Sequence, residues 1–145
     1  MSQAASAFAT LDELRSRVGQ QVFLTEWVLI DQRRIDLFAE ATEDYQWIHV
    51  DPVRAASASP FGGTIAHGFL TLPFCEMGIN YGLNKVRFTQ PVKAGGRVRG
   101  RFVLARLDDI DGGLQLTFRV TLEIEGVDKP ACIAESVVRQ YFKSA

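Results

Sequence analysis

The chain has 145 residues, of which 47% are hydrophobic, and its formal net charge at neutral pH is −1. This length and composition are sufficient for a hydrophobic core, so we expect a single domain over residues 1–145. The near-zero charge argues against nucleic acid as a partner, and the absence of a run of eighteen apolar residues argues against a membrane span.

The N-terminus and the cysteines predict a cytoplasmic protein. The first residues, MSQAASAFATLDELRSRV, lack the basic start and the apolar stretch of a secretory signal. Cys75 and Cys132 are isolated in apolar surroundings. This favours two buried, reduced thiols over a disulfide or a nucleophile.

The chain is expected to begin with a helix and a strand. Thr10, followed three residues later by Glu13, resembles a capping box, and it predicts a short helix that ends near Gly19. Residues 22–30, VFLTEWVLI, are rich in β-branched and aromatic side chains and predict a strand.

Two further helices carry clear start signals. Asp31 is expected to cap a helix over about residues 32–42, with an apolar face formed by Ile35, Leu37, Phe38 and Ala41. Asp51 before Pro52 is an N-cap followed by proline at the first helical position, so a short helix is expected within residues 45–66, which are otherwise loop. A capping role for Asp51 is therefore favoured over a catalytic one.

Residues 67–81, HGFLTLPFCEMGINY, are nearly all apolar. They predict a helix that is buried on most sides. Pro73 removes one backbone hydrogen bond and should kink this helix within its first two turns.

The rest of the chain predicts an antiparallel meander and hence an α+β domain. Strands are expected over residues 86–92, 97–107, 114–125 and 131–142. Asp111-Gly112-Gly113 marks a hairpin turn, and residues 126–130 a second turn. From Leu114 to Ile124 apolar residues alternate without a break, which predicts one buried face and one polar face.

Three arginines, Arg97, Arg99 and Arg101, alternate with other residues and should share one face of the sheet. They could meet the phosphates of a nucleotide-containing substrate. A solvated sheet face is the favoured interpretation.

Chemically active side chains gather on both sides of the short helix predicted after Pro52. Asp44 and His49 lie five residues apart, and a glycine-rich segment ends in His67-Gly68. A carboxylate and an imidazole are groups that exchange protons near neutral pH, so their spacing in apolar surroundings predicts an active site.

The segment resembles the signature of the MaoC-like (R)-specific enoyl-CoA hydratase/dehydratase family, whose members have the hot-dog fold. Gln46 and Trp47 stand where that signature usually has Asn and Pro, which makes DYQWIH similar to the nodulation-protein-N-like branch. The resemblance implies a curved antiparallel sheet wrapped around a central apolar helix, with a helical insertion that carries the active site. The matching residues are Asp44, His49, Asp51, Phe61-Gly62 and His67-Gly68.

The resemblance also implies a reaction, the reversible hydration of a trans-2-enoyl-CoA to an (R)-3-hydroxyacyl-CoA. Asp44 and His49 would hold one water, with His49 mainly activating it, and the backbone N–H of Gly68 would bind the thioester oxygen. Further candidates for orienting the substrate are Gln46, Gly63 and His67. Gln46 could instead face away from the site, and a buried His67 that positions the turn is favoured over a catalytic one.

The family implies a homodimer, an acyl-CoA thioester as the partner, and no metal or organic cofactor. A metal site formed by His49, Asp51 and His67 is disfavoured, because the sequence has no HxxxH motif or cysteine cluster. Two other functions remain open. One is a hot-dog acyl-CoA thioesterase, in which water attacks the thioester carbonyl, and the other is a non-catalytic acyl-binding module.

Overall fold

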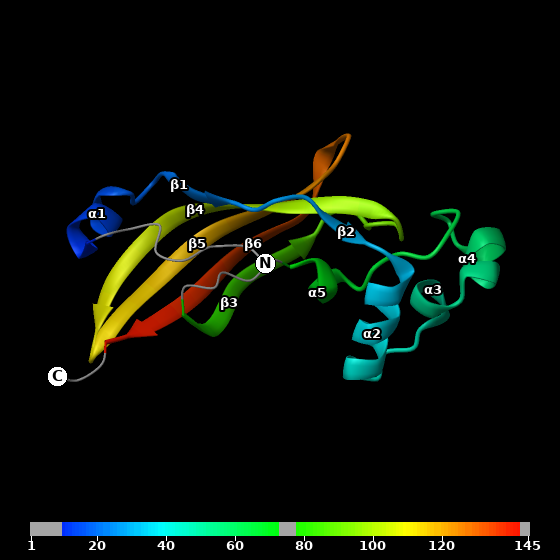
Figure 1. The fold of residues 1–145 in the computed structure, drawn as a ribbon, viewed down its shortest axis with the longest axis horizontal. Coiled ribbons are helices and arrows are strands. Elements are labelled where there is room, and N and C mark those ends of the chain that lie inside the picture. The colour runs from blue at the N-terminus through cyan, green and yellow to red at the C-terminus, as the bar shows by residue number, and fades with distance from the viewer. Residues whose placement is uncertain (1–9, 73–77, 143–145) are drawn as a thin grey trace.

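One curved antiparallel sheet forms most of the structure (Figure 1). The computed structural model describes residues 10–72 and 78–142, so the predictions about Pro73 and Cys75 lie outside the described residues. The strands pair in the order β1-β4-β5-β6-β3, and β2 also pairs with β4. Their bounds are Gln21–Leu24 (β1), Val28–Ile30 (β2), Ile79–Phe88 (β3), Gly96–Ile110 (β4), Gly113–Ile124 (β5) and Val127–Tyr141 (β6).

Two tight hairpins join β4, β5 and β6. The first turn, at Asp111-Gly112, was predicted and is confirmed, and Gly112 adopts a φ of 71° there. The second turn is shorter than predicted. Strand β6 already begins at Val127, because Gly126 adopts a φ of 74° and allows a two-residue connection.

The core lies on one face of this sheet, and the alternation predicted for β5 is confirmed. Five side chains of β5 that alternate along the strand are each at most 1% exposed, namely Leu114, Leu116, Phe118, Val120 and Leu122. The rings of Phe102 in β4 and Phe118 in β5 pack edge to face, with centroids 6.1 Å apart.

Three of the helices start where the sequence predicts. The hydroxyl of Thr10 accepts a hydrogen bond from the backbone N–H of Glu13 and caps α1 (Leu11–Ser16). The carboxylate of Asp31 accepts from Arg34 N–H and caps α2 (Gln32–Thr42). The carboxylate of Asp51 accepts from Arg54 N–H and caps α4 (Pro52–Ala58), which confirms the predicted capping role.

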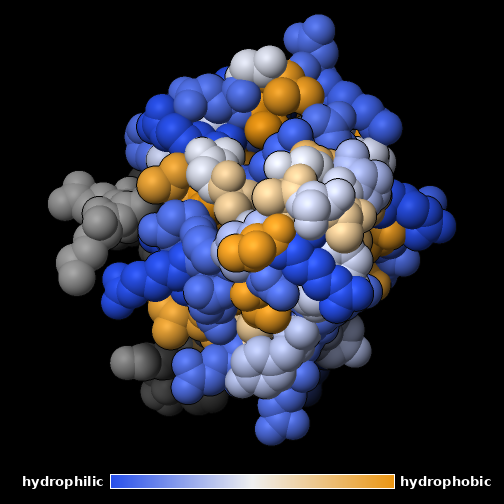
Figure 2. Space-filling model, turned by 90° about the vertical axis from the view of Figure 1, so that its right-hand side faces the viewer, coloured by the Kyte–Doolittle hydropathy of each residue, from blue (hydrophilic) through white to orange (hydrophobic). Residues whose placement is uncertain are grey.

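The helices α2, α3 and α4 gather at one end of the sheet, away from α1 (Figure 1). Helix α3 (Trp47–Val50) was not predicted, because it is a single turn and its N-cap makes no side-chain hydrogen bond. The apolar face predicted for α2 is partly wrong: Ile35 is buried and Phe38 half-buried, but Leu37 and Ala41 are exposed. Ala39, which was not predicted, is buried as well. Figure 2 shows that hydrophobic atoms form several separate groups among hydrophilic ones on this end of the molecule.

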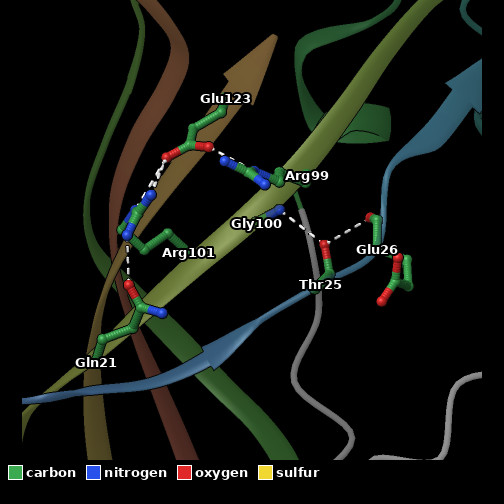
Figure 3. A network of polar contacts seen from close by, with 7 residues as sticks. All are labelled: Gln21, Thr25, Glu26, Arg99, Gly100, Arg101 and Glu123. Atoms are coloured by element: carbon green, nitrogen blue, oxygen red, sulfur yellow. Dashed lines mark hydrogen bonds and ion pairs between the residues drawn. The ribbon is translucent and has the colours of Figure 1, made fainter. Parts of the chain in front are cut away.

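The strand predicted over residues 22–30 is interrupted. Strands β1 and β2 are separated at Thr25, which pairs with Gly100 in a different way: its hydroxyl accepts from Gly100 N–H, and its own N–H donates to Gly100 O. Figure 3 shows Thr25 in this position beside β4. The chain therefore stays next to β4, and the hydroxyl of Thr25 replaces one backbone acceptor of the sheet.

The helix predicted over residues 67–81 is wrong for residues 79–81. Helix α5 covers Gly68–Thr71, and Ile79 to Tyr81 belong to β3. In β3, Ile79 lies opposite Arg139 and Asn80 opposite Val138 of β6, so sheet hydrogen bonds satisfy this backbone. An apolar run of this kind does not by itself distinguish a buried helix from a strand. Among the described residues no helix is long and apolar enough to cross a membrane.

Candidate active site

His49 is a nearly buried side chain that is held at its backbone and at its ring. Its backbone N–H donates to Gln46 O at 2.9 Å. Ring atom Nδ1 lies 2.8 Å from the carbonyl oxygen of Ile65. A carbonyl can only accept, so Nδ1 carries the proton and, in the neutral ring, Nε2 carries the lone pair. His49 therefore presents an atom that can take up a proton.

His67 lies against His49 and is 4% exposed. The two imidazole rings stack with centroids 3.9 Å apart and an interplanar angle of 26°. Nε2 of His67 lies 3.0 Å from the backbone carbonyl oxygen of Asp44, to which it donates. Nδ1 of His67 is buried and has no hydrogen-bond partner among the described residues. His67 thus ties the segment after α2 to the segment before α5.

Asp44 reaches the two histidines from the turn after α2. Glu43 ends that helix in the left-handed region, with a φ of 57°, and redirects the chain. The Asp44 carboxylate is 53% exposed, and its Oδ2 lies 3.9 Å from Nε2 of His67. Polar atoms of Asp44, His49 and His67 all lie within 4.8 Å of one another. The structure therefore brings together three of the residues named from the sequence.

A cavity of about 300 Å³ opens beside this cluster. Its lining includes both His49 and Gly68, the proposed base and the proposed oxyanion donor. Gly68 is the first residue of α5, so its N–H has no partner within the helix. The other lining residues are Ile65, Ala66, Thr71, Phe88, Thr89, Gln90, Pro91 and Val92.

Asp44 and His67 lie next to His49 but are not part of this lining. Gln46 and Gly63, the other candidates for orienting the substrate, are not part of it either. Gln46 is exposed, and its backbone N–H donates to Asp44 Oδ1 at 3.3 Å. Gly63 is half-buried in the segment after α4. Their positions give no support to a direct contact with a ligand in the cavity.

The three alternating arginines make ion pairs with Glu123 of β5 and with Glu125, the residue that follows this strand. Arg97 pairs with Glu125 at 2.8 Å. Arg99 and Arg101 both bind Glu123, at 2.6 and 2.7 Å (Figure 3). The hydrogen bonds from Arg99 and Arg101 lower the pKa of the Glu123 carboxyl. These pairs favour a structural role on the sheet surface, as the sequence also did.

The geometry of the histidine pair favours proton transfer over metal binding. A zinc ligand nitrogen lies about 2.0–2.1 Å from the ion with its lone pair aimed at it. The rings of His49 and His67 are stacked and close to parallel, so their remaining lone pairs converge poorly on one ion. Asp51, the third metal ligand considered from the sequence, caps α4 instead.

Sequence reasoning missed two parts of the site. The carbonyl of Ile65 sets the tautomer of His49, but a backbone acceptor leaves no signature in a sequence. Phe88 lies against Gly68, from a strand that starts earlier than the sequence indicates. In the sequence, only the alternation of residues 86–88 could have indicated which face of the sheet Phe88 lies on.

Comparisons with known proteins agree with the fold and the motif. Residues 13–125 match the family described as MaoC like domain. The chain is 48% identical over 146 residues to the 3-hydroxyacyl-thioester dehydratase Z of Mycobacterium tuberculosis, which covers 91% of this chain and 96% of the relative. It is 49% identical over 140 residues to Nodulation protein N of Rhizobium leguminosarum bv. viciae, covering 86% and 87%.

Two solved structures have the same fold at low sequence identity. An (R)-hydratase from A. caviae superposes with a TM-score of 0.64 at 24% identity and covers 94% of this chain and 98% of its own. A MaoC-like dehydratase from Rhodospirillum rubrum superposes with a TM-score of 0.70 at 19% identity, with 88% and 94% covered. These similarities confirm the predicted hot-dog fold.

Proposed function

The chain belongs to the MaoC-like dehydratase family, and we propose that it interconverts a trans-2-enoyl thioester of coenzyme A and the (R)-3-hydroxyacyl thioester. It is a hydratase or dehydratase enzyme, as the relative named 3-hydroxyacyl-thioester dehydratase supports. The proposal adds the R configuration of the hydroxyacyl product, coenzyme A as the carrier of the acyl group, and the residues that carry out the reaction.

In the proposed hydration, the oxygen of one water forms a bond to C3 of the enoyl group. His49 takes the proton that this water loses, at Nε2. A proton is delivered to C2 by the Asp44–His49 pair, so that H and OH are added across the double bond. The two groups act as a coupled pair, and the microscopic order of the proton movements belongs to the pair.

Negative charge develops on the thioester oxygen while C3 is attacked. We assign its stabilisation to the backbone N–H of Gly68, at the first position of α5. Removal of one such donor typically costs about 3 kcal/mol in the barrier. No metal or organic cofactor takes part in this scheme.

One observation carries the proposal: His49 and Gly68 line the same cavity, and the bond from His49 Nδ1 to Ile65 O places the lone pair of the neutral imidazole on Nε2. A base and an oxyanion donor in one cavity are what the addition of water to an enoyl thioester needs. The volume of about 300 Å³ is at the lower end of the range for small-molecule sites.

The test is to incubate the purified protein with crotonyl-CoA. Loss of the absorbance of the conjugated thioester, with (R)-3-hydroxybutyryl-CoA as the product on chiral analysis, is the expected result. Release of free thiol would instead identify a thioesterase. Binding of the thioester without turnover of either kind would identify an acyl-binding module.

We also propose that the protein is a homodimer. Strand β3 lies at one edge of the sheet, where it pairs with β6 (Figure 1). Four large apolar side chains on β3 are exposed, namely Ile79, Tyr81, Leu83 and Phe88. An open edge with exposed apolar side chains is a surface that proteins usually cover.

A further inference from the structure

The side-chain amide of Gln32, the first residue of α2, makes three hydrogen bonds to three different segments. Its Nε2 donates to the backbone carbonyl of His49 at 2.7 Å and to the carboxylate of Asp36 at 2.8 Å. Its Oε1 accepts from the hydroxyl of Thr64 at 2.6 Å. Both N–H groups of the amide and its oxygen are thus engaged.

These partners fix the orientation of the amide. The carbonyl of His49 and the carboxylate of Asp36 can only accept, so the NH₂ group must face them. A flipped amide would place its oxygen against two acceptors. It would also leave Thr64, which is 5% exposed, without an acceptor at this position.

The hydrogen bond from His49 Nδ1 to Ile65 O orients the imidazole, and two of the bonds made by Gln32 hold the two sides of this contact. One side is the backbone of His49 itself. The other is Thr64, whose neighbour Ile65 provides the carbonyl that accepts the proton of Nδ1. The same short segment is anchored further by Ile65 N–H to Ile48 O at 3.1 Å and by Ala94 N–H to Thr64 O at 3.0 Å.

We propose that Gln32 is a positioning residue for His49. Its amide fixes the backbone of His49 relative to Ile65, and thereby holds the imidazole in the tautomer with the proton on Nδ1 and the lone pair on Nε2. Gln32 does not line the cavity and touches no reacting atom. The inference rests on the proposed function for its kinetic consequence, but the tautomer it predicts is a property of the protein without substrate.

The first experiment measures that tautomer directly. The chain has two histidines, so ¹⁵N-histidine labelling gives signals from two rings, and His49→Gln assigns them. The wild type should show His49 with the proton on Nδ1. In Gln32→Leu the Nδ1–H tautomer should lose its dominance, with both tautomers populated.

Asp36→Ala is the matched control, because it removes the bond that Gln32 makes within α2 and leaves the two bonds to the site. It should keep the wild-type tautomer of His49. An unchanged tautomer in Gln32→Leu, or the same change in Asp36→Ala, would overturn the proposal.

Kinetics provide the second readout. A base held slightly out of place lowers turnover more than binding, so Gln32→Leu should reduce kcat by about 10- to 100-fold with little change in KM. Thr64→Val removes the hydroxyl that binds Oε1, and it should lower kcat in the same way. Thr64→Ser restores the donor and should recover activity relative to Thr64→Val.

The two proposals fail in different ways. If the wild type does not hydrate crotonyl-CoA but Gln32→Leu alters the tautomer, the proposed function is wrong and the positioning role stands. If the wild type hydrates crotonyl-CoA and Gln32→Leu matches it in kcat and tautomer, the positioning role is wrong. If Gln32→Leu does not fold, the comparison of Thr64→Val with Thr64→Ser tests the proposal instead. Equal kcat values in these two variants would overturn the positioning role of Gln32.

Discussion

The ring of Phe88 occupies the space that a side chain on residue 68 would need. A Cβ placed on Gly68 would lie 2.9 Å from three atoms of that ring. Contacts this short between a Cβ and another heavy atom hardly occur in proteins, so either the ring or the turn before α5 has to move. The backbone of the proposed oxyanion donor therefore packs directly against an aromatic side chain of β3.

Gly68→Ala should lower both stability and turnover. Overpacking of this kind typically costs about 1–3 kcal/mol in the free energy of unfolding, and a displaced N–H should lower kcat by about 10²- to 10³-fold. Thermal unfolding and crotonyl-CoA kinetics measure the two effects. In Gly68→Ala/Phe88→Ala the clash is absent, so the loss of stability relative to Phe88→Ala should shrink. A Gly68→Ala variant with normal kcat would refute the assigned role of Gly68.

Asp44 and His49 should behave as one unit. Asp44→Asn and His49→Gln are each expected to lower kcat by about 10²- to 10⁴-fold with a modest effect on KM, because both residues act on the transition state. The double variant should be little worse than the poorer single variant. Steady-state kinetics measure this, and circular dichroism verifies folding. Multiplicative losses in the double variant would contradict a shared water.

Glu123 should contribute to stability in a pH-dependent way. Its carboxyl pKa is lowered by the bonds from Arg99 and Arg101, so the folded protein binds this proton more weakly than the unfolded chain. The contribution is present above the usual carboxyl pKa, about 4.3, and is lost as the pH falls through the lowered pKa. Glu123→Gln lacks it. Urea unfolding from pH 7 to pH 3 should show the wild-type advantage over Glu123→Gln narrowing towards acid, and a constant difference would contradict the coupling.

Activity should survive removal of divalent metals. The proposed scheme uses backbone donors and the Asp44–His49 pair, and the stacked histidines are poorly arranged to share an ion. Extensive dialysis against EDTA should leave kcat unchanged on crotonyl-CoA. Loss of turnover that zinc restores would mean that Asp44, His49 and His67 are metal ligands.

The protein should sediment with about twice the mass of the chain at micromolar concentration. Replacing exposed apolar side chains of β3 by charges, as in Ile79→Lys/Leu83→Lys, should shift the equilibrium towards the monomer, because each copy would bury a charge in the interface. Val53→Lys is a control on α4, where an equally apolar side chain is 84% exposed. A wild type that stays monomeric and active would refute the dimer.

Local signals predicted the elements they govern. Thr10, Asp31 and Asp51 start helices because a cap acts on backbone groups two or three residues away, and Gly112 makes its turn for an equally local reason. The helix expected over residues 67–81 is wrong at residues 79–81, because pairing with β6, a partner more than fifty residues away, decides the state of Ile79 to Tyr81.

The candidate site could likewise be predicted only in part. The spacing of Asp44 and His49 and the His67-Gly68 pair were visible in the sequence, and the structure places them side by side. Their orientation was not visible, because it depends on the carbonyl of Ile65 and on the amide of Gln32. Gln32 at the start of a helix has no local feature that distinguishes it from a solvated glutamine.

The sheet order has a consequence for how the chain folds. The hairpins β4-β5 and β5-β6 close over two-residue turns, whereas β3 must pair with β6 across two intervening strands in the sequence. Contacts between residues near in sequence form faster than distant ones. The cavity needs Phe88 at the end of β3, Gly68, and the bridge between Ile65 and Lys93. A refolding chain should therefore build its hairpins first and become competent for turnover only when β3 docks.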